Sequence, residues 1–101
     1  MSDSLDFTLH LGALLREVRT EQHLTLTELS VRAHVAVSHI SDIERGATNA
    51  SIEVVESLSR ALRVSLPSLL RVLAYRMERT LPATNNAKEA HRADIPALSH
   101  A

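Results

Sequence analysis

The chain has 101 residues, of which 45% are hydrophobic and 23% are charged, and it contains no cysteine. This length and apolar content suit one small domain with a single core. The absence of cysteine excludes a disulfide framework and a zinc–thiolate site. The chain starts with polar and acidic residues, and its apolar runs are only a few residues long. We therefore expect a cytoplasmic protein with neither a signal peptide nor a membrane span.

The charge is balanced, with a formal net charge of −1. Residues 8–64 contain six arginines and seven acidic residues. Many nucleic-acid binders have a broad basic surface, and this sequence predicts none. Any contact with nucleic acid would depend on a few placed groups, with weak non-specific affinity.

Helices are predicted along most of the chain, because glycine and proline are scarce and apolar residues recur at helical spacing. The expected helices span residues 9–23, 25–33, 37–45, 51–62 and 66–80. We expect residues 1–7 to be disordered. We also expect a disordered tail over residues 82–101, where small and polar residues dominate.

Local signals mark several helix ends. Thr25 and Glu28 have the spacing of a capping box, and Ser51 is a good N-cap for the fourth helix. Gly46 suits the position just after the third helix. The buried side of the fourth helix is expected to consist of Ile52, Val55, Leu58, Ser59 and Leu62.

The most informative stretch is residues 25–46, TLTELSVRAHVAVSHISDIERG. Two short helices joined by a tight turn form a unit that can place its second helix in a major groove. The core positions of this unit are expected to be Leu29, Ala33, Val35, Ile40 and Ile43.

This stretch resembles the lambda Cro/CI-type (XRE) helix-turn-helix family, whose members typically read T-Q-x-E-L-A-x-x-A-G-V-S-x-x-x-I-S-x-I-E-R-G. The matching residues are Thr25, Glu28, Leu29, Ala33, Val35, Ile40, Ser41, Ile43, Glu44, Arg45 and Gly46. The likeness covers roughly residues 8–70. It implies an all-α, five-helix, lambda-repressor-like domain over residues 8–81, with an extended C-terminal helix.

The resemblance also implies a function. We expect a transcription regulator that binds double-stranded DNA as a homodimer on an inverted repeat, with residues 37–45 as the recognition helix. No cofactor, metal or small-molecule ligand is expected. Compact members of the family that are similar include actinobacterial regulators of Clp protease genes, restriction–modification controller proteins and Cro-like phage regulators.

Three positions depart from the family pattern. His34 replaces the turn glycine, and histidine is one of the more tolerated residues in left-handed backbone. Ala36 replaces the serine that caps the recognition helix, which removes about 1 kcal/mol of capping. Leu26 replaces a glutamine that contacts phosphate. These changes affect the expected affinity for the DNA backbone more than they affect the expected fold.

The resemblance assigns roles to individual residues. The expected base-reading residues are Val37, Ser38, Ser41 and Asp42. The expected DNA-backbone contacts are Thr27, His39, Arg45, Thr48, Asn49 and Ser51. Val37 can pack against a thymine methyl group. Asp42 can accept from a cytosine amine, bind a neighbouring arginine or exclude wrong sequences. Arg19 and Glu44 match a structural ion pair of the family.

The last predicted helix, residues 66–81, has an apolar stripe longer than the family domain needs for its core. Self-association is the favoured explanation, through the residues Leu69, Val72, Leu73, Arg76 and Met77. Folding back onto the monomer's own core and binding of a distinct partner protein remain alternatives.

Other functions are weaker readings of the same residues. The chain has six histidines, and their spacing is not that of a metal site. They are His10, His23, His34, His39, His91 and His100. The hydroxyl, imidazole and carboxyl groups near residues 38–42 lie on one exposed helix without a cleft, so no enzyme is expected. A protein-interaction module, such as an antitoxin or co-regulator acting through the last helix, is the second hypothesis. Only DNA binding should weaken steeply with salt.

Overall fold

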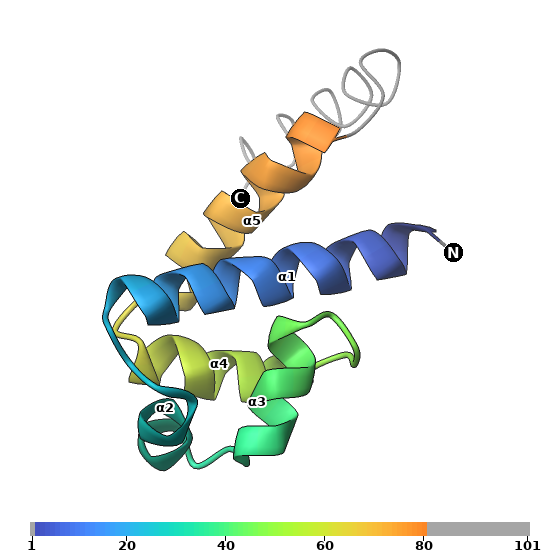
Figure 1. The fold of residues 1–101 in the computed structure, drawn as a ribbon. Helices are drawn as coiled ribbons and strands as arrows, with labels where there is room; N and C mark the ends of the chain where they lie inside the picture. Colours follow the sequence, from blue (N-terminus) through green and yellow to red (C-terminus); the bar gives the residue numbers. More distant parts are fainter. Residues whose placement is uncertain (1, 81–101) are drawn as a thin grey trace.

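The computed structural model describes residues 2–80, and this part of the chain consists of five helices without a strand (Figure 1). The helices are α1 (Ser2–Glu21), α2 (Leu26–Ala33), α3 (Val37–Glu44), α4 (Ile52–Ala61) and α5 (Leu66–Thr80). The all-α, five-helix prediction is confirmed. The predicted disordered tail, residues 82–101, lies outside the described residues. Within residues 2–80, no helix is both long enough and apolar enough to cross a bilayer.

Helix α1 differs from the prediction at both ends. It begins at Ser2, so residues 2–7 are helical where disorder was expected. The prediction is based on an apolar stripe that starts at Leu11. Such a stripe cannot indicate a polar first turn that precedes it. The helix ends at Glu21 because His23 adopts a left-handed φ of 59°.

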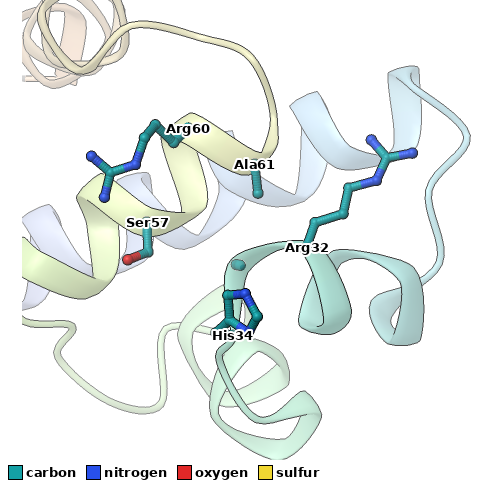
Figure 2. Close-up of a pocket in the computed structure, with 6 residues that line it drawn as sticks. Arg32, His34, Ser57, Arg60 and Ala61 are labelled. Atoms are coloured by element: carbon teal, nitrogen blue, oxygen red, sulfur yellow. The ribbon is translucent and has the colours of Figure 1, made fainter.

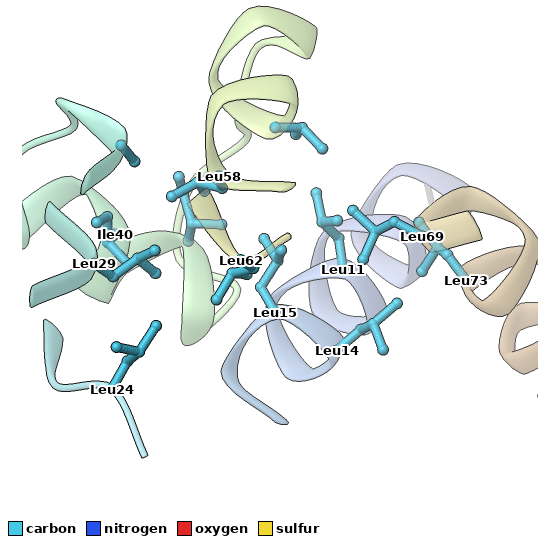
Figure 3. Packing of buried hydrophobic residues seen from close by; sticks show 13 residues of the cluster. Leu11, Leu14, Leu15, Leu24, Leu29, Ile40, Leu58, Leu62, Leu69 and Leu73 are labelled. Atoms are coloured by element: carbon cyan, nitrogen blue, oxygen red, sulfur yellow. The ribbon is translucent and has the colours of Figure 1, made fainter. Parts of the chain in front are cut away.

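The core is formed by residues from all five helices and the α1–α2 turn. Its buried members are Leu11, Leu14, Leu15, Leu24, Leu29, Ala33, Ile40, Ile43, Val55, Leu58, Leu62, Leu69 and Leu73. Helix α1 contacts both α3 and α5, and Figure 3 shows Leu11 and Leu14 on the side facing Leu69 and Leu73. The long first helix therefore holds the last helix on one side and the third on the other.

The buried side of α4 matches the prediction except at one residue. Val55, Leu58, Ser59 and Leu62 are buried, whereas Ile52 is 57% exposed. Ile52 is on the predicted stripe, but it is the first residue of the helix. No described residue covers it there, because periodicity specifies a face and not how far the neighbouring elements extend.

Helix α5 packs on its own protomer, which corrects part of the predicted dimer interface. Leu69 and Leu73 are each 2% exposed, so these two residues are unavailable to a partner. Met77 packs at the edge of the same core, and Arg76 pairs with Glu17 of α1 at 2.5 Å. Of the predicted interface, Val72 remains exposed. Residue spacing alone could not separate a stripe that covers the core from one that awaits a partner.

The Glu17–Arg76 pair predicts a pH dependence of stability. The hydrogen bond from Arg76 lowers the pKa of Glu17 below its usual value of 4.5. The stabilisation is therefore present above pH 4.5 and is lost as the pH falls through the lowered pKa. We expect Glu17→Gln to cost less than about 1 kcal/mol near neutral pH, because the pair is partly exposed.

Urea unfolding at neutral and acidic pH tests this expectation. Glu78→Gln is the matched control, since Glu78 is an exposed residue of α5. The loss of stability in acid should be smaller in Glu17→Gln than in the control. An identical pH dependence in the two variants would contradict the assignment.

Candidate nucleic-acid interface

Helices α2 and α3 form the expected two-helix unit. Leu29 and Ala33 of α2 and Ile40 and Ile43 of α3 are buried between the helices and the rest of the core. The turn after α2 is closed by His34, which has φ 59° and ψ 40° and donates its backbone N–H to the Ser30 carbonyl at 2.9 Å. Histidine therefore occupies the left-handed position of the family's turn glycine.

The two helices of the unit start differently. Thr25 and Glu28 form the predicted capping box, in which the Glu28 N–H donates to Thr25 Oγ1 at 3.0 Å and the Thr25 N–H donates to Glu28 Oε1 at 2.8 Å. These contacts lower the pKa of Glu28. Helix α3 has no side-chain cap, because Ala36 occupies the N-cap position. The first N–H groups of α3 are thus left for solvent or a ligand.

The predicted base-reading residues share the outward side of α3. Val37 is 38% exposed, Ser38 is exposed, and Ser41 and Asp42 are half-buried. The opposite side of α3, with Ile40 and Ile43, is buried in the core. The four residues therefore lie on the side of α3 that a ligand can approach.

Asp42 has a protein partner. Arg45, the C-cap residue of α3, donates from Nη2 to Asp42 Oδ1. The side chain of Asp42 is 46% exposed and that of Arg45 is 62% exposed. This contact corresponds to one of the roles expected of Asp42, the binding of a neighbouring arginine. It also places a predicted phosphate-contacting residue beside a predicted base-reading one.

The loop between α3 and α4 contains further residues with predicted backbone roles. Ser51 caps α4, accepting from the Val54 N–H at 3.1 Å. Asn49 Oδ1 accepts from Thr8 Oγ1 of α1 at 2.6 Å. Thr48 lies beside Asn49 in the same loop. Sequence analysis missed Thr8 because no local pattern links residues so far apart.

The remaining predicted phosphate contacts lie on the two helices. Thr27 is exposed in the first turn of α2, and His39 is half-buried in α3. The predicted DNA contacts therefore come from three parts of the fold. These are the first turn of α2, the outward side of α3 and the α3–α4 loop.

Arg19 and Glu44 form the ion pair expected from the family resemblance. Arg19 Nε donates to Glu44 Oε2 at 2.7 Å, and Nη2 donates to Oε1 at 2.9 Å. Arg19 Nη1 also donates to the Leu24 carbonyl at 2.8 Å. The side chains are only 12% and 5% exposed, and the contacts with Glu44 raise the pKa of Arg19. The pair fixes α1 against the last turn of α3.

A hollow of about 270 Å³ opens between α2 and α4 (Figure 2). Its lining residues are Arg32, Ala33, His34, Ser57, Arg60 and Ala61. The side chains of Arg32 and Arg60 extend away from each other in Figure 2. Because these charged groups do not converge on one point, we assign no ligand to the hollow.

The fold and the two-helix unit define a helix-turn-helix protein. A family model described as helix-turn-helix matches residues 15–69. The chain belongs to the helix-turn-helix family, of the XRE type.

Individual relatives share this part of the chain. The HTH-type transcriptional regulator DdrOP3 of Deinococcus deserti is 35% identical over 69 residues, which cover 68% of this chain and 54% of that protein. The chain spans about half the length of the first curated relatives it matches. The relatives are named as transcriptional regulators, a class without enzymatic activity.

Solved structures show the same arrangement. The clp gene regulator ClgR from C. glutamicum has a TM-score of 0.65 and 34% identity, over 70% of this chain and 91% of that one. This likeness agrees with the expected similarity to actinobacterial Clp-gene regulators. The restriction–modification controller protein C.Esp1396I, solved as a tetramer with its 35-base-pair operator, has a TM-score of 0.66 over 70% of this chain and 93% of that one. At 22% sequence identity, this structural likeness shows a shared fold and no more.

Proposed function

We propose that the chain is a sequence-specific DNA-binding transcription regulator that acts as a homodimer on an inverted repeat. The observation that supports it most is the arrangement of α3, whose apolar side is packed in the core while Val37, Ser38 and Asp42 stay accessible. An α-helix fits the major groove, which is about 12 Å wide. Membership of a family of named transcriptional regulators supports the same function.

The proposed division of labour follows from side-chain chemistry. Val37 packs against a thymine methyl group, and Ser38 and Ser41 exchange hydrogen bonds with base edges. The α3–α4 loop and the first turn of α2 contact phosphates, which position the domain without reading sequence. Because the domain has so few basic groups, base reading contributes a large share of the discrimination.

Selection of genomic fragments by the purified protein tests the base-reading role. We expect the double variant Val37→Ala/Ser38→Ala to bind the enriched fragment at least tenfold more weakly, because each good base contact contributes about 1–3 kcal/mol. The matched control, Val31→Ala/Ser57→Ala, removes the same atoms from α2 and α4. Equal affinity of the two double variants would place base reading elsewhere.

The proposed homodimer would use the exposed side of α5. On this side Val72 is 42% exposed and Tyr75 is 57% exposed, although Leu69 and Leu73 are buried in the core. Two copies are required because one recognition helix reads only a short half-site. The solved operator complex of C.Esp1396I contains a tetramer, which supports assembly in proteins of this fold.

We expect Val72→Glu to raise the dimer dissociation constant at least tenfold, or about 1.4 kcal/mol, because a charge would be buried at the interface. Sedimentation equilibrium measures this change. Val31→Glu is the control, since Val31 of α2 is 69% exposed and lies outside the proposed interface. If the wild-type protein is monomeric, or if Val72→Glu dimerises as the wild type does, this interface is wrong.

The second candidate function is a protein-interaction module that works through α5. The exposed apolar residues of α5 favour it, as does the balanced charge. Salt separates the two functions, because counterion release weakens DNA binding but not an apolar contact.

A further inference from the structure

We propose that Asp42 and Arg45 form a single recognition unit that reads cytosine, in which Arg45 joins the Asp42 carboxylate to a DNA phosphate. This inference rests on the proposed function, since it specifies how one position of the DNA site is read. Its central observation is the contact between Arg45 Nη2 and Asp42 Oδ1 on the exposed side of α3.

The contact leaves both groups free to make a second interaction. It uses one oxygen of the carboxylate and one nitrogen of the guanidinium. Asp42 Oδ2 therefore remains to accept from a base, and a guanidinium has five N–H donors in a planar fork. A continuous chain of hydrogen bonds can run from a cytosine N4 amine through Asp42 and Arg45 to a phosphate oxygen.

The backbone holds the two side chains at the right places for this chain. Asp42 lies in the last turn of α3, whereas Arg45 follows the last residue of the helix, in helical conformation with φ −84° and ψ −3°. Its backbone N–H donates to the Ser41 carbonyl at 3.1 Å. Asp42 thus projects from the groove-facing side, and Arg45 lies at the end of the helix that leads into the α3–α4 loop.

Electrostatics explains why the two residues must act together. A carboxylate between two rows of phosphates is repelled, and an adjacent guanidinium offsets that repulsion. In the free protein an exposed pair is worth only about 0–1 kcal/mol, so it costs little to rearrange. In a dehydrated interface the same pair interacts more strongly, because the effective dielectric constant falls.

The unit makes the two contacts interdependent. A cytosine amine satisfies Asp42 and leaves Arg45 oriented toward the backbone. A guanine or thymine at that position presents an acceptor to the carboxylate, and an adenine presents its N7 acceptor beside its N6 amine donor. Each of these bases moves Asp42 and Arg45 together. The wrong base is therefore penalised at the base and at the phosphate.

The test measures dissociation constants for every single-base variant of one half-site of the enriched fragment. The proteins are the wild type, Asp42→Asn, Arg45→Gln and the double variant, with Arg32→Gln as a control arginine outside α3. The side chain of Asp42 is 46% exposed and that of Arg45 is 62% exposed, so the variants should fold, and their melting temperatures check this.

We expect one position at which the wild type prefers cytosine at least tenfold and at which both single variants lose most of that preference. On the cytosine half-site, the double variant should bind no worse than Arg45→Gln alone. The proposal is overturned if Arg45→Gln weakens all base variants by the same factor and keeps the preference, which would make Arg45 an independent phosphate contact. It is also overturned if no position prefers cytosine. If no fragment is enriched at all, the proposed function itself fails together with this inference.

Discussion

Replacing Gly12 by alanine is expected to lower the free energy of unfolding by about 3 kcal/mol or more, since overpacking commonly costs 1–3 kcal/mol even where side chains can adjust. A Cβ atom at Gly12 would lie 2.2 Å from the Ile43 carbonyl oxygen and 2.8 Å from that of Glu44. Both contacts are with backbone, which cannot rotate away. The α1–α3 crossing would have to open.

The direction in which Gly12→Ala changes the free energy of unfolding is informative. Alanine is favoured over glycine in a helix interior by about 1 kcal/mol, so the same substitution would stabilise a helix that had no close neighbour. Urea unfolding monitored by circular dichroism measures the change. Ala13→Ser is the control, because it adds one atom at the next, exposed position of α1. A Gly12→Ala variant as stable as the wild type would mean that α1 and α3 do not approach as closely as described.

Removing the Arg19 side chain should lower the free energy of unfolding by about as much as Gly12→Ala does. Arg19→Ala leaves the Glu44 carboxylate, whose side chain is 5% exposed, without its cation. Breaking such a buried pair from one side costs about 3–5 kcal/mol. Arg19→Ala/Glu44→Ala should cost clearly less than Arg19→Ala alone, because an unpaired buried charge is the expensive state.

Glu44→Ala alone should be milder than Arg19→Ala, since Arg19 keeps its hydrogen bond to the Leu24 carbonyl. Chemical denaturation of the three variants forms a double-mutant cycle. A double variant that costs the sum of the two single losses would refute the coupling between the two residues.

The sequence predicted features that depend on short-range chemistry. The capping box of Thr25 and Glu28, the N-cap Ser51 and the left-handed Gly46 each depend on residues within one helical turn. The Arg19–Glu44 pair was predictable only through the family pattern, since 25 positions separate its members.

Features that depend on how helices meet were missed. The stripe of α5 was correctly identified as apolar, but Leu69 and Leu73 are covered by α1 and not by a partner. The Glu17–Arg76 pair, 59 positions apart, and the contact of Thr8 with Asn49 follow from those helix positions. A sequence pattern specifies which face of a helix is apolar, whereas the three-dimensional arrangement decides what covers it.

The central claim is that α3 reads DNA as part of a dimer. The most direct test is to titrate salt against the affinity for the best genomic fragment. We predict an inverted repeat with half-sites about 10 base pairs apart, bound at least about tenfold more weakly at 200 mM than at 50 mM salt. Enrichment of no fragment above background, even at low salt, would contradict the claim and direct attention to a protein partner of α5.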